Sequence, residues 1–285
     1  MTEISAIANG TEGVVDASTL IARINLISHA TVRTAVSRLQ DDHGITDADT
    51  AFRALYTAAK RFDVKLRHVA AAVLAHDEDA DAAAGEAGTA PALPFSTGRR
   101  TGAAKRSEVL ADLASAAAEL TAAPKVAVHL RHQLHGGVCI ESQLGLGEGY
   151  RRHFSYVDDA GSAAGRAMSS CGLVRLDDVA TSPIYTYADA AVLASEGVRA
   201  ELAAAMCDET GREWGAVSVL FDVRHPRIDP FAVEMLQGHA DSCAQWLRWY
   251  DQAVTPRIVA AVHDHARKVG AADASPVPAA APASA

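Results

Sequence analysis

Cysteine is scarce in this sequence, and the four that occur are widely spaced: Cys139, Cys171, Cys207 and Cys243. No two of them form a CxxC pair, so their spacing gives no support for a zinc knuckle or a dithiol redox motif. We therefore expect four small, half-buried thiols in a reducing cytosol.

Long hydrophobic runs and an excess of positive charge are also missing. No apolar segment approaches the ~18 residues of a membrane span, and the first residues lack the layout of a signal peptide. We therefore expect a cytoplasmic protein with no membrane partner. The 26 Lys and Arg residues against 35 Asp and Glu give a net charge of −9. A uniformly acidic protein repels nucleic acid, unless its positive charge is concentrated in one region.

The residues that are present divide the chain, which at 285 residues exceeds a typical domain of about 100–200. Composition and hydrophobic periodicity predict a helical domain over 17–76, a flexible linker over 77–106, a mixed domain over 107–250, and a C-terminal helix with a low-complexity tail over 251–285. Residues 20–76 carry eight basic and five acidic groups, so positive charge gathers in the helical domain.

Three helices are predicted in the helical domain. Apolar residues recur every three or four positions up to Gly44, a residue suited to the left-handed position that ends a helix. Thr46 is expected to cap the second helix and Asp63 the third. The first helix is the longest and would overhang the other two. Its apolar stripe therefore needs a partner, which would come from a coiled-coil dimer or from intramolecular docking.

The mixed domain alternates helices with short strands. A helix is predicted over 108–120, followed by a hairpin whose strands 126–130 and 138–142 flank a turn at Gly136 and Gly137. The further predicted elements are a helix over 163–170, strands over 173–176, 200–206 and 214–221, and a closing helix over 230–250. Helices that bracket hairpins indicate an α+β fold with a mainly antiparallel sheet.

A family pattern runs through residues 30–74. It consists of Ala35, Leu39, Gly44, Ile45, Ala48, Ala51, Phe52, Leu55, Ala58, Ala59, Lys65, Leu66, Val69 and Ala70. These residues resemble the ANTAR domain, the three-helix RNA-binding module of bacterial transcription antiterminators. The resemblance implies a partner, an RNA hairpin in nascent transcripts, and a homodimer.

Basic residues at the junction of the second and third helices are the candidate RNA contacts. We expect Arg61, Lys65 and Arg67 to bind phosphates, with Arg53 and Lys60 behind them. Tyr56 lies four residues after Phe52 on the second helix. We expect its ring to face the core, and stacking on an unpaired base is the alternative.

A second pattern runs through residues 107–250. Its residues are Gly161–Ala167, Asp177, Asp178, Ser182, Pro183, Glu196–Arg199, Trp214–Val219 and Phe231. They resemble a GAF domain, a small-molecule-sensing or dimerising fold of bacterial regulators. The resemblance implies a ligand pocket on one side of the sheet, under the loops 145–155 and 182–187. Tyr150, Arg151 and Tyr185 are its candidate ligand contacts.

No cofactor is expected, and the small molecule cannot be named from the sequence. The Asn-Lys-Phe-Asp-Glu signature of cyclic-nucleotide-binding GAF domains is missing, and no cysteine can be assigned to bilin attachment. His129, His132 and His135 do not predict a metal site, because side chains alternate along a strand and the three cannot converge.

Three functions remain open. The first is an antitermination regulator that binds RNA under the control of its GAF domain. The second is a non-catalytic dimerisation or interaction protein that has lost RNA binding, because Val36 and Asp42 stand where ANTAR domains often carry basic residues. The remote third is a GAF-type methionine sulfoxide reductase, which would need two cysteines brought together. We expect no enzymatic activity.

Overall fold

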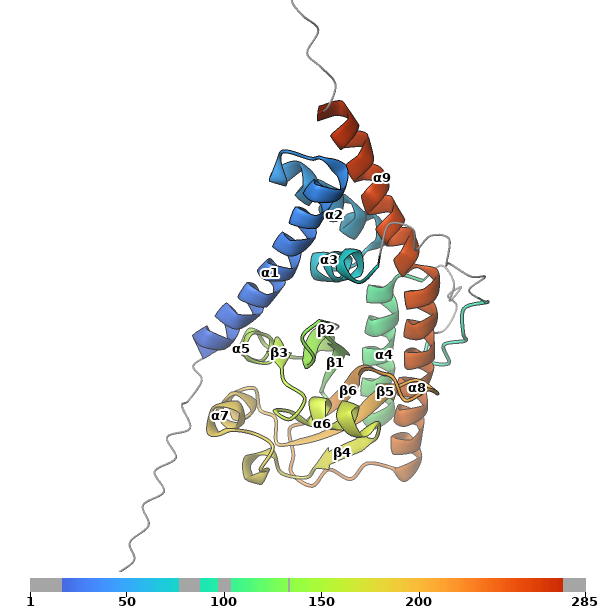
Figure 1. The fold of residues 1–285 in the computed structure, drawn as a ribbon. Coiled ribbons are helices and arrows are strands. Elements are labelled where there is room, and N and C mark those ends of the chain that lie inside the picture. Colours follow the sequence, from blue (N-terminus) through green and yellow to red (C-terminus); the bar gives the residue numbers. More distant parts are fainter. Residues whose placement is uncertain (1–16, 77–87, 97–103, 133, 274–285) are drawn as a thin grey trace, which may run out of the picture.

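Helices from both ends of the chain form one layer of the molecule, and a six-stranded sheet with helices on both faces forms the rest (Figure 1). The computed structural model describes residues 17–76, 88–96, 104–132 and 134–273. The α+β architecture predicted from the sequence, with three N-terminal helices ahead of an antiparallel sheet, is confirmed.

The N-terminal helices are α1 (Ala17–His43), α2 (Ala48–Phe62) and α3 (Leu66–Ala75). Gly44 has a φ of 64° and ends α1 as predicted. The two predicted caps are wrong. Asp47, one residue after Thr46, caps α2 by accepting hydrogen bonds from the backbone N–H groups of Asp49 and Thr50. Asp63 instead ends α2 in a left-handed conformation, which Asp tolerates because its short polar side chain hydrogen-bonds locally.

The C-terminal helix α9 (Thr255–Asp273) completes the helical layer. It follows α8 (Pro230–Ala253) directly and packs on α2 and α3. Ile258, Val262 and Ala266 are buried along α9, and the described part of α1 packs on α2, α3 and α9. Ala35, Val36 and Leu39 of α1 are buried, so this part of the apolar stripe is covered from within the chain, as intramolecular docking predicts. The side chains of the stripe before residue 29 lie outside the described residues.

The sheet has the strand order β3-β2-β1-β6-β5-β4, with every neighbouring pair antiparallel. Its strands are β1 (Lys125–Arg131), β2 (Val138–Leu144), β3 (Tyr156–Val157), β4 (Leu173–Leu176), β5 (Ala200–Cys207) and β6 (Glu213–Phe221). The predicted hairpin is confirmed, with positive φ at both Gly136 and Gly137. β3 was not predicted.

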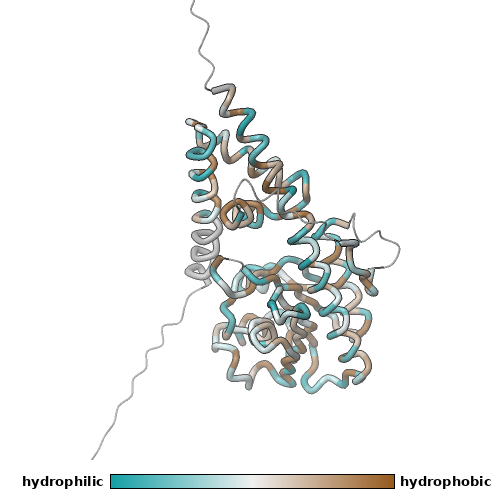
Figure 2. Tube along the Cα trace, turned by 45° about the vertical axis from the view of Figure 1, so that its right-hand side comes forward, coloured by the Kyte–Doolittle hydropathy of each residue, from teal (hydrophilic) through white to brown (hydrophobic). Residues whose placement is uncertain are grey.

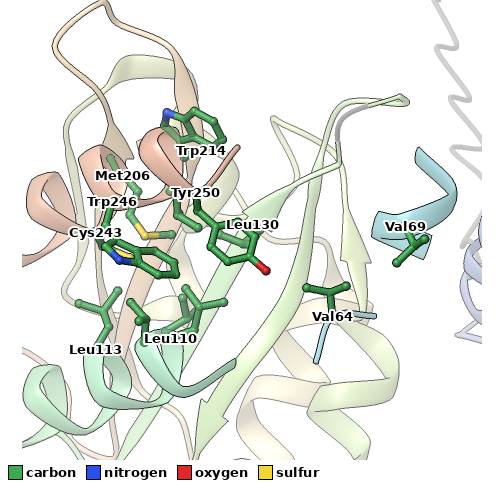
Figure 3. Packing of buried hydrophobic residues seen from close by; sticks show 14 of the residues in the cluster. Val64, Val69, Leu110, Leu113, Leu130, Met206, Trp214, Cys243, Trp246 and Tyr250 are labelled. Atoms are coloured by element: carbon green, nitrogen blue, oxygen red, sulfur yellow. The ribbon is translucent and has the colours of Figure 1, made fainter. Parts of the chain in front are cut away.

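Two groups of helices cover the two faces of the sheet (Figure 1). One face packs on α4 (Arg106–Thr121) and α8, and Figure 3 shows its core, where Leu110, Leu113, Trp246 and Tyr250 come together. The other face lies under α5 (Glu148–His153), α6 (Ala163–Ser170), the 3₁₀ turn Val179–Thr181 and α7 (Tyr187–Ser195). Of these, α5 falls in a segment predicted as a loop, and α7 was not predicted. Figure 2 shows α3 as a largely hydrophobic helix at the centre of the molecule.

Part of the segment predicted to be a flexible linker is held in place. Residues 77–87 and 97–103 lie outside the described residues, as does the tail beyond residue 273. Within 88–96, Leu93 is buried, the Phe95 ring packs on His239, and the indole of Trp249 donates to the carbonyl of Gly88 at 2.8 Å. This stretch therefore packs along α8.

The expectation of four free thiols is wrong for two of the cysteines. Cys171, at the end of α6, and Cys207, at the end of β5, form a disulfide. Cys139 and Cys243 are free and buried. The pairing joins residues 36 positions apart, a distance at which sequence spacing gives no sign of proximity.

Candidate functional site

Two of the predicted RNA contacts face the sheet domain. The ammonium of Lys65 lies 3.1 Å from Glu141 Oε2 and donates to the carbonyl of Ile140 at 3.0 Å. Arg67 forms a close ion pair with Glu141 Oε1, and His68 Nε2 lies 2.9 Å from the same oxygen. In this arrangement, Lys65 and Arg67 share the single carboxylate of Glu141 on β2.

The environment of Glu141 explains how a carboxylate is kept charged there. Only 4% of its side chain is exposed. Burial by itself would raise its pKa, but His68, Arg67 and Lys65 oppose this and hold the pKa of Glu141 well below its usual value. His68 is buried too, and burial first, then the neighbouring Arg106, lowers its pKa to about 4. The cluster therefore contains one carboxylate, two cations and a neutral imidazole at neutral pH.

The remaining predicted RNA contacts, Arg53, Lys60 and Arg61, lie exposed on α2. Phe52 and Tyr56, expected in the core, are 38% and 46% exposed and stack with ring centroids 6.3 Å apart. The Lys60 ammonium lies 5.5 Å from the centroid of the Tyr56 ring. The prediction of a core role for Tyr56 is therefore wrong, because Leu55 and four alanines provide the buried face of α2 (Ala51, Ala54, Ala58 and Ala59).

The loops predicted to cover a ligand pocket bring two aromatic residues together. Tyr150 on α5 and Tyr185 ahead of α7 both pack on Phe154. The Tyr185 hydroxyl donates to Glu201 of β5. Burial raises the pKa of Glu201, and the hydrogen bond from Tyr185 offsets part of that effect. The third candidate, Arg151, is exposed and donates to the carbonyl of Gly147 at 3.3 Å.

Two histidines on this side of the sheet have buried nitrogens without a hydrogen-bond partner among the described residues. They are Nδ1 of His129 on β1 and Nδ1 of His153, whose Nε2 lies 2.6 Å from Asp189. Strand pairing places His129 beside Ala216, and therefore on the face that carries Leu220 and Glu201. Buried polar atoms are rarely left unpaired, so this face has unused hydrogen-bonding capacity for a ligand.

Sequence reasoning missed both buried carboxylates of these sites. Glu201 gave a signal, because it is the only charged residue in an otherwise apolar strand, Ala200–Cys207. Glu141 gave none, because its partners lie more than seventy positions away in the sequence. Within the described ranges, no group of His, Cys, Asp or Glu side chains is placed to hold a metal ion. None of the described helices combines the length and apolar character of a membrane span.

The fold and this arrangement define a class of sensor domain, built on an antiparallel sheet whose second face is closed by short helices and loops over a polar cluster. Residues 105–247, half of the chain, match the GAF domain family, and the chain belongs to that family. The match does not extend to the N-terminal helices, so their resemblance to ANTAR domains stays a hypothesis.

Solved structures of GAF domains resemble this chain. One is the GAF domain of a phosphoenolpyruvate-protein phosphotransferase from Coxiella burnetii, at 14% identity over 53% of this chain and 87% of that chain, with a TM-score of 0.44. Another is a GAF domain/HD domain protein from Geobacter sulfurreducens, at 16% identity over 50% of this chain and 91% of that chain, with a TM-score of 0.43. A free methionine-R-sulfoxide reductase from Neisseria meningitidis is similar at 17% identity over 57% of this chain and 99% of that chain, with a TM-score of 0.42. No curated protein matches the chain significantly.

Proposed function

We propose that this protein is a non-enzymatic, ligand-responsive regulator that binds an RNA hairpin in nascent transcripts through its helical layer. The exposed pair Phe52 and Tyr56 carries the proposal, because Lys60 lies over one ring and Arg53 beside the pair on the same helix. Exposed rings stack on unpaired bases, and flanking cations bind phosphates. Phe52 and Tyr56 do not contribute to the core of this domain, because other residues form the buried face of this Ala-rich helix.

The contacts of Lys65 and Arg67 provide a means of control. While Glu141 holds both cations against β2, RNA meets only Lys60, Arg61 and Arg53, the last of which lies 3.7 Å from Asp47 at an exposed site. If α3 leaves β2, five cations become available to the RNA instead of three. A ligand of the GAF domain that favours one of these two states would therefore change RNA affinity.

The ligand of the GAF domain is a small molecule bound beneath α5 and α7. The nitrogen of His153 that has no hydrogen-bond partner among the described residues, together with Glu201 and the hydroxyl of Tyr185, supplies polar groups, while Tyr150 supplies an apolar wall. The rings of Tyr150 and Tyr185 would move aside to admit it. A homodimer remains part of the proposal, since GAF domains and ANTAR-like helices both commonly dimerise.

RNA pulldown followed by sequencing tests the proposal on the full-length chain. Tyr56→Ala should weaken binding by about 1–3 kcal/mol, the value of one stacked base. Lys60→Gln should weaken binding and lower its dependence on salt. With three phosphates contacted, log affinity should fall with log salt with a slope of about −2, from 0.7 per contact.

Arg227→Gln is the matched control, because it removes an exposed arginine from the sheet domain. It should leave RNA recovery unchanged. Equal recovery from wild type, Tyr56→Ala and Lys60→Gln would contradict the RNA assignment. It would favour the alternative of a dimerisation or interaction protein, for which sedimentation of the same variants gives the direct measurement.

The disulfide between Cys171 and Cys207 is the one observation that favours the remote alternative, a GAF-type methionine sulfoxide reductase. Cys207 lies six residues beyond Glu201 on β5, or about 20 Å along an extended strand. The sulfur pair is therefore remote from the polar cluster under α5 and α7. We expect no turnover when the protein is incubated with free methionine sulfoxide and a dithiol reductant.

A further inference from the structure

A cavity of about 660 Å³ lies where the helical layer meets the sheet domain. Its walls come from α3, the start of α4, the adjoining ends of β1 and β6, and the junction of α8 with α9. The volume is within the range of about 300–1,000 Å³ that is typical of small-molecule sites. It belongs to the core shared by α4 and α8, and is separate from the cluster around Tyr150 and Glu201.

About half of the cavity wall is apolar. Val69 of α3 and Ile258 of α9 contribute from the helical layer, and Leu130, Trp214 and Leu247 contribute from the sheet domain. Figure 3 shows Leu130 and Trp214 on one side, with Val64 and Val69 across from them. Such a surface accommodates a hydrocarbon or aromatic body.

Two polar groups of the wall have no hydrogen-bond or ion-pair partner among the described residues. Arg106, at the start of α4, forms no ion pair or hydrogen bond with any described residue. Tyr250 is only 5% exposed, and the described residues offer its hydroxyl no hydrogen bond. Arg106 and Tyr250 line the same cavity. Burial raises the pKa of Tyr250, Arg106 lowers it, and Asp63 raises it. Figure 3 shows the hydroxyl directed toward the side where Val64 lies.

The other charges around the cavity are already balanced. Arg131 forms a close ion pair with Glu213, and Arg212 lies 3.4 Å from Asp251. The guanidinium of Arg212 also stacks 4.1 Å from the centroid of the Trp214 ring. The nearby carboxylate of Asp63 accepts a hydrogen bond from Ser107 and does not line the cavity. Arg106 is therefore the cation of the wall that has no ion pair among the described residues, and a single anionic group would be favourable beside it.

We propose that this cavity binds a small organic anion, whose single acidic group is held by Arg106 and the hydroxyl of Tyr250 and whose apolar body packs on Trp214, Leu130 and Val69. The proposal goes beyond the RNA-binding function and does not depend on it. Because α3 and α9 form one wall and the sheet domain the other, the bound anion holds the two layers together.

The fluorescent probe 8-anilinonaphthalene-1-sulfonate has the required chemistry, with one sulfonate on an aromatic body, and its emission rises in apolar surroundings. Titrating it into the full-length protein should give saturable binding to one site. Arg106→Gln should weaken the probe's affinity at least tenfold, and Tyr250→Phe about three- to tenfold. Arg227→Gln, which removes an exposed arginine elsewhere, should leave the affinity unchanged.

Equal affinity in wild type, Arg106→Gln and Tyr250→Phe would overturn the proposal, as would non-saturating binding of many probe molecules. Tyr250→Phe keeps the test independent of folding, because it removes one oxygen atom to which no described residue forms a hydrogen bond. Excitation of the tryptophans supplies a second readout. Energy transfer to the bound probe should fall in Trp214→Phe if the probe lies against that ring.

Discussion

At the scale of single residues, His129 shows what the burial of a lone titratable group does. It is 3% exposed on β1, and burial alone lowers its pKa from 6.5 to about 4. Between these two values the unfolded chain binds a proton that the folded protein does not. The contribution of His129 to the free energy of unfolding therefore falls as the pH decreases from 7 toward 4.

We predict that wild type loses up to about 3 kcal/mol of unfolding free energy through His129 over this range, since one pKa unit corresponds to about 1.4 kcal/mol. Urea unfolding at a series of pH values measures it. His129→Leu should flatten the curve, whereas His29→Leu, which removes an exposed imidazole on α1, should leave its shape unchanged. Parallel curves for wild type and His129→Leu would contradict the prediction.

Single residues also show the limit of the sequence. Glu201 could have been recognised as a special carboxylate, because every neighbour on its strand is apolar. Glu141 could not, because nothing near it in the sequence indicates that Lys65, Arg67 and His68 lie around it. Local pattern identifies unusual residues, but long-range packing decides their partners.

At the scale of elements, two helical glycines provide a matched pair. A methyl group added to Gly270 of α9 would come 2.3 Å from the carbonyl oxygen of His43, whereas one added to Gly238 of α8 meets nothing within 4 Å. Alanine normally stabilises a helix interior over glycine by roughly 0.5–1 kcal/mol. We predict that Gly238→Ala raises the unfolding free energy by that amount and that Gly270→Ala lowers it, because α1 and α9 must separate. Calorimetry of both variants measures the two changes in stability. A gain in stability in both variants would contradict the close contact between Gly270 and the His43 carbonyl.

The disulfide joins α6 to β5 and should contribute to stability through the unfolded chain. For a separation of 36 residues, the chain-entropy relation gives about 4 kcal/mol. We predict a loss of that size on reduction, measured by urea unfolding with and without a dithiol. The double variant Cys171→Ser/Cys207→Ser should start at the lower stability and show no further loss with reductant. If the dithiol also lowered the stability of the double variant, the loss in wild type would not come from this disulfide.

Periodicity predicted the long helices and the strand pairs, because an apolar face repeats along each of them. It failed where small residues provide the buried face. On α2, alanines face the core, so the large rings of Phe52 and Tyr56 are left outside. It also failed for α7, where only Leu193 is buried and no amphipathic pattern marks the helix.

At the scale of the whole molecule, the helical layer is fastened to the sheet domain in two ways. The covalent continuation of α8 into α9 places α9 against α2 and α3. The ion pairs of Lys65 and Arg67 with Glu141 tie the start of α3 to β2. Only the second can be released without breaking the chain or exposing a large apolar surface, so it is the natural point of control.

We predict that Glu141→Gln leaves the buried Arg67 without its counter-charge and lowers the unfolding free energy by about 3 kcal/mol, the lower end of the range for a broken buried pair. Hydrogen exchange should quicken at the amides of α3 while those of β5 and β6 stay protected. Because Lys65 and Arg67 then become available to phosphates, the slope of log RNA affinity against log salt should steepen from about −2 to about −3.5, at 0.7 for each of five cations. Glu148→Gln removes a carboxylate that pairs with Arg152 at an exposed site and should change none of these. Unchanged exchange at α3 in Glu141→Gln would mean that apolar packing, and not this ion-pair cluster, holds the layers together.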